Sequence, residues 1–425
     1  MKNYIYLLLI CSLFNCSKEE EPQNFILPQP SVSLTSNIEV YNENLLENSL
    51  VLAVENGGNT SYLLNKEGER VFEWNFDTRL GNDLEIIEGG KLLGMFKVNA
   101  PEISFGGAGG TIKILNPNSS VDWQYTYASE NYIAHHDVEL LPNGNLLFMA
   151  WEKVEPLTAQ SNGVNVTEAI YPETLIEINP DSNQIVWKWN SFDHIVQDLD
   201  STKLNYGVIN DNPNLIDINY NSVAQGGDIM HANGIDYDET EDIIYLSVND
   251  YSEIWVIDHS TTTLEAASNT GGNYNKGGDL IYRFGNPEAY NNVGDRLFYN
   301  NHFPNLIEKE VPGKDNMLVF VNRDNNQTQS AVYELELPAT FNLIPNTNNE
   351  PNIVWQFTDT EMYSKIISGA VRLPNGNTLI CEGDYGFWEI TAGGEIAWKY
   401  NGMGVSLWRC YNYNTEDELL DDLML

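Results

Sequence analysis

Positive charge is scarce in this chain of 425 residues: 21 Lys and Arg stand against 61 Asp and Glu, a formal net charge of −40. A surface this acidic repels phosphate backbones, so nucleic-acid binding is excluded as a function. Anionic lipid headgroups are disfavoured as partners for the same reason. A disordered acidic chain is also excluded, because 10 Trp, 23 Tyr and 15 Phe need a core in which to be buried.

Cysteine is rare as well, with four in the chain. Two of them lie near the N-terminus, so the folded part keeps Cys381 and Cys410, which allow at most one disulfide. No CxxC pair or Cys/His cluster has the spacing of zinc ligands. The sequence therefore predicts no structural zinc site.

One hydrophobic run, residues 4–14, follows Lys2 and is about half as long as a membrane-spanning helix. It predicts an export signal over residues 1–15. The run ends in Leu13-Phe14-Asn15-Cys16, which resembles a lipoprotein cleavage box with Cys16 as the lipid-bearing residue. Residues 16–40 then form a tether that begins with an acidic tract. We expect an outer-membrane lipoprotein, periplasmic or surface-exposed, that touches the membrane only through its lipid anchor.

A repeated sequence motif predicts the architecture of the chain. Residues 141–147 read LPNGNLL and residues 373–379 read LPNGNTL, and three looser turns fill the same slot elsewhere. Asn-Gly between apolar runs is a strong β-hairpin signal, because both turn positions need positive φ. A second hairpin whose last strand carries Trp, Tyr or Phe follows each turn. Its six copies cover residues 63–76, 112–127, 175–189, 255–284, 333–357 and 388–400.

Two hairpins per copy give four strands, which is the unit of a β-propeller. The sequence therefore predicts an all-β fold, a six-bladed propeller of four-stranded antiparallel blades over residues 41–425. One sheet of this kind cannot bury both of its apolar faces alone, whereas radial packing buries them between neighbours. An Asp- and Asn-rich insertion near residues 190–227 is expected to form a loop or a small cap.

Three of the six histidines occupy the same register of the repeat. His136 lies six residues before the Pro142 turn, and His231 lies six before Tyr237 in the next copy. His302 takes the same place when it is counted back from the apolar triplet of the fifth copy. Side chains at this position of successive inner strands converge on the central channel, so we expect these three histidines to share one pocket.

The other three histidines are expected to lie outside that pocket. His135 neighbours His136 and should point the opposite way along the strand, where it packs against the blade or hydrogen-bonds to it. His194 and His259 fall in loop-like segments and are predicted to be surface residues.

Five short motifs carry a resemblance to the arylsulfotransferase (aryl-sulfate sulfotransferase) family. They are His135-His136-Asp137, His231-Ala232-Asn233, Ser247-Val248-Asn249, Asn301-His302 and residues 278–285. The resemblance implies a six-bladed propeller from a family of exported bacterial enzymes. Such an enzyme moves a sulfuryl group from an aryl sulfate donor to a phenolic acceptor through a covalent histidine intermediate. It is independent of the nucleotide donor PAPS and needs no cofactor.

The resemblance also implies roles for individual residues. His302 matches the nucleophile, and His136 and His231 match the two supporting histidines. The family has an arginine in a Ser-x-Arg run, where this chain has Asn249, a neutral donor to a sulfate oxygen. We place Asn249 and His135 among the substrate-binding residues. Arg323 is the candidate replacement cation, and an ordinary salt bridge with Asp324 or a neighbouring carboxylate is the alternative for it.

The three histidines are also chemically suited to sulfuryl transfer. The reaction needs a neutral nucleophile, donors for the sulfate oxygens and an acid for the leaving phenolate, and imidazoles with a pKa near ~6.5 can play each part. A transition metal is the second interpretation of three histidines, but no carboxylate or Cys shares their register. A different class of function also stays open: a non-catalytic propeller that binds a sulfated or aromatic ligand or a protein partner at the cell surface.

Overall fold

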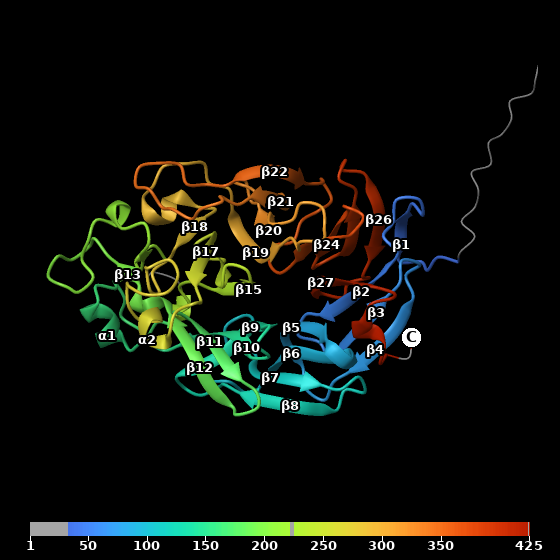
Figure 1. The fold of residues 1–425 in the computed structure, drawn as a ribbon, viewed down its shortest axis with the longest axis horizontal. Helices are drawn as coiled ribbons and strands as arrows, with labels where there is room; N and C mark the ends of the chain where they lie inside the picture. The colour runs from blue at the N-terminus through green and yellow to red at the C-terminus, as the bar shows by residue number, and fades with distance from the viewer. Residues whose placement is uncertain (1–32, 222–224, 424) are drawn as a thin grey trace, which may run out of the picture. The chain divides into compact units, whose positions relative to one another are not determined.

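Alternating short strands and tight turns fold into six four-stranded antiparallel sheets within residues 34–425. The computed structural model describes residues 33–221, 225–423 and 425. The expected export signal, Cys16 and the tether up to residue 32 lie outside the described residues. The six sheets form a β-propeller, which confirms the predicted fold class (Figure 1).

The first three blades are read from the inner strand outward. Blade 1 is β27 (Leu407–Asn414), β2 (Ser49–Glu55), β3 (Thr60–Leu64) and β4 (Arg70–Asn75). Blade 2 is β5 (Leu80–Ile87), β6 (Lys91–Lys97), β7 (Gly110–Leu115) and β8 (Val121–Thr126). Blade 3 is β9 (Tyr132–Leu140), β10 (Leu146–Glu152), β11 (Glu173–Asn179) and β12 (Gln184–Asn190).

The other three blades follow the same order. Blade 4 is β15 (Ala232–Asp238), β16 (Ile243–Val248), β17 (Glu253–Asp258) and β18 (Tyr282–Phe284). Blade 5 is β19 (Tyr299–Leu306), β20 (Met317–Arg323), β21 (Ala331–Glu336) and β22 (Asn352–Phe357). Blade 6 is β23 (Gly369–Arg372), β24 (Thr378–Glu382), β25 (Gly386–Ile390) and β26 (Ile396–Asn401), with β1 (Ile38–Tyr41) on its outer edge.

The insertion between blades 3 and 4 carries little regular structure. It contains a two-stranded parallel pair, β13 (Ile195–Val196) and β14 (Ile216–Asp217), and the short 3-10 helices η2 (Ser191–Asp193), η3 (Ile209–Asp211) and η4 (Gln225–Gly227). The remaining helices are α1 (Pro156–Ser161), α2 (Thr263–Ala266), η1 (Glu88–Gly90), η5 (Pro287–Tyr290) and η6 (Glu418–Leu420). In the described part of the chain, no helix has the length and apolar character needed to cross a bilayer.

The ring closes through the two ends of the unit. β27, from the C-terminal end, pairs with β2 as the innermost strand of blade 1, and β1 adds to the outer strand β26 of blade 6. Each inner strand contacts the inner strands of both neighbouring blades, so β27, β5, β9, β15, β19 and β23 surround one centre. Residues on these strands therefore face each other even when hundreds of residues separate them in sequence.

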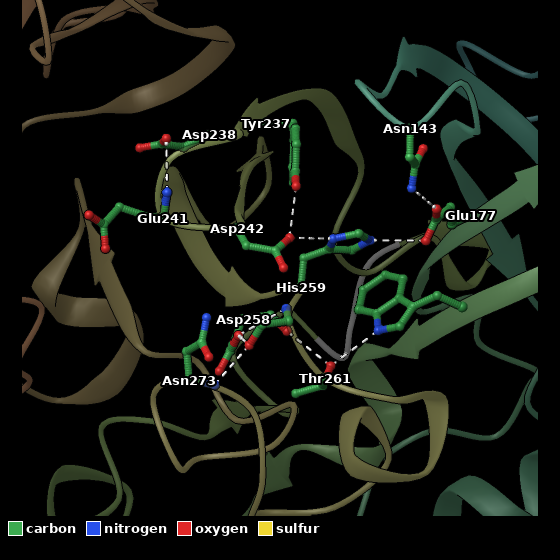
Figure 2. A network of polar contacts seen from close by, with 12 residues as sticks. Asn143, Glu177, Tyr237, Asp238, Glu241, Asp242, Asp258, His259, Thr261 and Asn273 are labelled. Carbon is green, nitrogen blue, oxygen red and sulfur yellow. Dashed lines mark hydrogen bonds and ion pairs between the residues drawn. The ribbon is translucent and has the colours of Figure 1, made fainter.

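His259 lies at the seam between blades 3 and 4, not on the surface as predicted (Figure 2). Its Nδ1 is 2.8 Å from Asp242 Oδ1 and its Nε2 is 3.2 Å from Glu177 Oε2, so the ring bridges the two blades. The prediction for His194 was wrong too: its Nδ1 lies 2.8 Å from Asp279 Oδ1 and its Nε2 2.7 Å from the Ala266 carbonyl oxygen. Both segments are loop-like in sequence, but they pack against a neighbouring blade.

The His259 bridge should make stability depend on pH. Burial opposes the imidazolium, but bonds to Glu177 and Asp242 raise the pKa of His259, so its contribution is full below about pH 6.5 and is lost as the pH rises through the higher folded pKa. Burial opposes ionisation of Glu177, yet its bonds to His259 and two amides lower its pKa to about 2, so its contribution is present above about pH 4.3 and falls in acid.

We expect His259→Gln to lower the free energy of unfolding by about 1–3 kcal/mol near pH 5.5 and by less as the pH rises. Denaturant unfolding over a pH series would measure this. Glu239→Gln, in an exposed turn of blade 4, is the control and should show no such trend. A loss for His259→Gln that stays constant across the series would contradict the charged bridge.

Candidate active site

The three histidines of the repeat register lie together on the inner strands. His136 is in β9, His231 directly precedes β15, and His302 is in β19. The His136 and His231 rings meet edge to face with centroids 5.0 Å apart. Trp408 of the closing strand β27 lies between His136 and His302, with its ring centroid 5.7 Å from that of His136 and 6.0 Å from that of His302. The register argument therefore located a real cluster.

Backbone bulges aim these side chains. His136 and His231 have φ of 54° and 50°, and Phe303, next to His302, has φ of 51°. The strand pairing slips at the same places in β9, β15 and β19. Bulges bend a strand and redirect a side chain, and they are frequent beside functional sites. In three successive inner strands, regular strand pairing is thus interrupted where one histidine is placed.

The bulge also overturns one prediction. His135 does not point away from His136: their Nδ1 atoms are 2.8 Å apart. A bulge breaks the alternation of side chains on which that prediction relied. The expected contact with the blade is present, because His135 stacks on Trp151 with centroids 3.7 Å apart and its Nε2 lies 2.9 Å from Glu173 Oε2.

His302 is held as a neutral imidazole with a defined tautomer. Asn322 donates through Nδ2 to two backbone carbonyls, so its Oδ1, 2.6 Å from His302 Nδ1, accepts a proton from that nitrogen. The lone pair is then on Nε2, which accepts from the Ile367 N–H at 3.1 Å. Burial lowers the pKa of His302 to about 3, despite the opposing bond to Asn322, so the ring is uncharged at physiological pH.

His231 has the opposite charge state. Burial opposes its imidazolium, but the hydrogen bond and the charge of Asp228, with the Asp250 and Glu173 charges, raise its pKa to about 9. Asp228 Oδ2 lies 2.5 Å from His231 Nδ1. The ring keeps 26% of its side-chain surface exposed, and within the described residues its Nε2 makes no hydrogen bond. His231 thus offers the site a fixed positive charge and a free N–H.

Glu173, His135 and His136 form a chain of hydrogen bonds. With Glu173 ionised, His135 donates through Nε2 and His136 through Nδ1, which leaves a lone pair on His136 Nε2. A proton taken up at that Nε2 can pass along the chain to Glu173 without creating a new charge. Burial raises the pKa of Glu173 well above its usual range, which favours this uptake. The chain can therefore store one proton.

The backbone of Gly107 lies close to His136 Nε2, at the outer end of this chain of hydrogen bonds. Its backbone has φ of +83°, and a Cβ there would lie 2.0 Å from His136 Nε2. A side chain is thus excluded on two grounds, conformation and space. The loop between β6 and β7 approaches His136 closely without covering the nitrogen with a side chain.

The two residues considered for the role of the family arginine differ in their contacts with the histidine cluster. Asn249 Nδ2 is 3.0 Å from the Asn301 carbonyl oxygen and 3.5 Å from His302 Nδ1, so it borders the cluster. Arg323 makes no hydrogen bond to any of the three histidines in the described part of the chain, and no ion pair with Asp324. It lines an adjoining cavity, and its role at the reacting sulfate stays a prediction.

Sequence reasoning missed several residues of this site. Trp408 packs between two of the histidines, and its buried Nε1 has no hydrogen-bond partner among the described residues. Asp228, Glu173 and Asn322 set the charge and tautomer of the histidines. Asn322 directly precedes Arg323, Asp228 lies three residues before His231, and Glu173 lies two residues before the copy at 175–189, but none of the three recurs in the repeat. Trp408 lies beyond the last copy.

The described part of the chain contains two cysteines and no cluster of metal ligands. Cys381 and Cys410 are buried free thiols on β24 and β27. Across residues 33–221 and 225–423, no three His, Cys, Asp or Glu side chains adopt an arrangement that would hold a metal ion.

The fold and the cluster define a class: a six-bladed propeller with neutral and charged imidazoles on three successive inner strands. The family model described as Arylsulfotransferase (ASST) matches residues 35–414. The chain therefore belongs to the arylsulfotransferase family, as the sequence motifs predicted. Membership supports aryl sulfotransfer as the general activity and implies an aryl sulfate and a phenol as its small-molecule partners.

Comparison with curated proteins found no match. Among solved structures, a protein of unknown function from Bacteroides caccae is 13% identical, with a TM-score of 0.49 over 86% of this chain and 99% of its own. Raptor from Chaetomium thermophilum is 11% identical, with a TM-score of 0.45 over 88% of this chain and 25% of its own. A putative 6-phosphogluconolactonase from Bacteroides fragilis is 10% identical, with a TM-score of 0.41 over 86% of this chain and 98% of its own.

Asp228→Asn should discharge His231. The amide keeps a hydrogen-bonding group but removes the neighbouring negative charge, so burial then dominates and the pKa of His231 falls from about 9. Imidazole NMR over a pH titration would follow the change. His302 is the internal control, because it should stay neutral throughout the neutral range in both proteins. An unchanged titration of His231 would show that Asp228 does not hold the charge.

Proposed function

We propose that this chain transfers a sulfuryl group from an aryl sulfate to a phenol through a sulfohistidine intermediate on His302. The observation that carries the proposal is the split in charge within one cluster. His302 keeps a lone pair at Nε2, whereas His231 nearby is protonated. A nucleophile and a cation that are built from the same residue type fit a displacement at an anionic sulfate.

In the first step, His302 Nε2 attacks sulfur, and the bond from sulfur to the aryl oxygen breaks with its electron pair on that oxygen. The Ile367 N–H must release Nε2 for this attack, and it then lies near enough to donate to a sulfate oxygen. A proton from His136 Nε2 neutralises the leaving phenolate when the Glu173 chain is loaded. His302 keeps its Nδ1 proton, hydrogen-bonded to Asn322 Oδ1, so the sulfated ring carries the positive charge until the second step.

The second step runs the same chemistry in reverse. The acceptor phenol loses its proton to His136 Nε2, and its oxygen attacks the sulfur on His302, which restores the lone pair of Nε2. The Glu173–His135–His136 chain regains the proton that it released in the first step. One turnover therefore balances in protons and needs no other base.

His231 takes over the charge that the missing arginine would supply. Asn249 and His231 are adjacent, because the Asn249 N–H donates to the His231 carbonyl oxygen at 3.3 Å. A neutral amide at Asn249 can contribute one hydrogen bond, while the imidazolium contributes charge and an N–H. The unpartnered Trp408 N–H, beside His136 and His302, is a further donor within the cluster.

The decisive measurement is the covalent intermediate. Incubation of the wild-type protein with an aryl sulfate alone should add one sulfuryl group, and peptide mapping at neutral or alkaline pH should place it on His302. His302→Ala should abolish both the adduct and the turnover, because no other neutral nitrogen lies in its position. His259→Gln, which removes a histidine from the blade seam, should retain the adduct. Binding of an aryl sulfate without any adduct would favour the rival function, a non-catalytic receptor.

We also propose that the protein is exported and lipid-anchored at Cys16. The support is the hydrophobic run at residues 4–14, the cleavage-box resemblance and the acidic tract that follows. Cys16→Ser should release the protein from membranes and abolish labelling by a fatty-acid probe. Membrane retention of that variant would argue against the anchor.

A further inference from the structure

A cavity of about 500 Å³ adjoins the histidine cluster at the junction of blades 4 and 5. Its walls include Arg296, Arg323, Tyr299, Asn300 and Asp250. Asn300 Nδ2 donates to Asn249 Oδ1 at 2.8 Å, and Asn249 in turn borders His302. Asn300 and Asn249 therefore connect the wall of this cavity to His302.

The cavity also adjoins the charged histidine. Asp250 lies beside it, because its N–H donates to the Met230 carbonyl oxygen at 3.0 Å and its charge helps to raise the pKa of His231. A substrate whose sulfate lies between His231 and His302 would thus direct its aromatic ring toward the cavity wall.

Arg323 is the cation of this cavity with unused hydrogen-bonding capacity. Its buried Nε has no hydrogen-bond partner among the described residues, and its Nη2 donates to the Lys365 carbonyl oxygen at 3.5 Å. Within the described residues it forms no ion pair. A buried guanidinium N–H that lacks a partner is costly, and an anionic ligand is the group that satisfies it best.

Arg296 stands on the same wall in a fixed position. Its Nε donates to the Phe298 carbonyl oxygen at 2.8 Å and its Nη2 to Ser252 Oγ at 3.1 Å, while the guanidinium lies 4.5 Å from the Tyr299 ring centroid. Its ion pair, with Glu288 at 3.3 Å, involves a carboxylate that is 68% exposed and therefore screened by water. In a chain with a net charge of −40, this cavity brings two guanidinium groups together with the single carboxylate of Asp250 in its described lining.

We propose that this cavity binds a carboxylate or sulfonate on the aromatic ring of the substrate, with Arg323 as its main contact and Arg296 as a second. This rests on the proposed function, which puts the reacting sulfate at His302. The leaving phenolate and the entering phenol occupy the same place in the two steps, so the preference applies to donor and acceptor alike. Acidic phenols and their sulfate esters are the substrate class.

The kinetic test compares two donors that differ in one charge, 4-carboxyphenyl sulfate and its neutral analogue 4-(hydroxymethyl)phenyl sulfate. We expect the wild-type kcat/KM to favour the carboxylated donor by roughly tenfold or more, as for one charge-assisted hydrogen bond. Arg323→Gln should remove this preference, because it should lower kcat/KM for the carboxylated donor roughly tenfold more than for the neutral donor. Arg70→Gln, on the outer strand β4, is the matched control and should keep the preference.

A binding measurement separates this proposal from the proposed function. Calorimetry with 4-hydroxybenzoate and 4-hydroxybenzyl alcohol needs no sulfuryl transfer. Tighter binding of the benzoate that is lost in Arg323→Gln would uphold the cavity even if no aryl sulfate turned over. Turnover of aryl sulfates without tighter benzoate binding, or a benzoate preference that survives Arg323→Gln, would overturn the cavity proposal and leave the transferase in place.

Discussion

A buried arginine on the strand that closes the ring organises the centre of this propeller. Arg409 of β27 donates to Asp137 Oδ2 at 2.7 Å and to the Asn233 carbonyl oxygen at 2.8 Å, and it lies 3.4 Å from Asp83. Its guanidinium thereby joins blade 1 to blades 2, 3 and 4. Removing one partner from such a buried network leaves an uncompensated charge, which costs about 3–5 kcal/mol. Trp408, the preceding residue, contacts His136 and His302, so the strand that closes the ring also packs against the histidine cluster.

The three histidines of the site differ in charge because each imidazole contacts different groups. An ionised neighbour, Asp228, keeps His231 charged, whereas the neutral amide of Asn322 leaves burial to keep His302 uncharged. His136 contacts neither Asp228 nor Asn322. Its pKa falls well below the usual value because the ring is buried and lies near the charged His231. In the proposed reaction, the charged His231 supplies the cation for the anionic substrate. The position in the repeat does not explain these different charge states, because His136, His231 and His302 share one register.

The repeat was readable from sequence because each blade must solve the same packing problem with the same turn and the same aromatic strand. The register of His136, His231 and His302 followed from that repetition. The closing strand was not readable: Trp408 and Arg409 lie beyond the last copy, and β27 pairs with β2 from the other end of the unit. The pairing of His135 with His136 was missed because a bulge carries no signature in one sequence. His259 was misjudged because a loop can still be part of a seam.

The segment before β23 couples the tautomer of His302 to a strained backbone. Ile367 and Ser368 have φ of 59° and 89°, and a β-branched residue in this region costs on the order of 1–2 kcal/mol. Contacts offset that cost: Asn322 Nδ2 donates to the Ile367 carbonyl oxygen at 2.9 Å, and the Ser368 N–H donates to Trp408 O at 3.1 Å. The same asparagine that fixes the proton on His302 Nδ1 therefore also presents the Ile367 N–H to Nε2. In the proposed reaction the sulfate displaces that N–H from His302 Nε2, so the backbone position of Ile367 bears directly on access to the nitrogen.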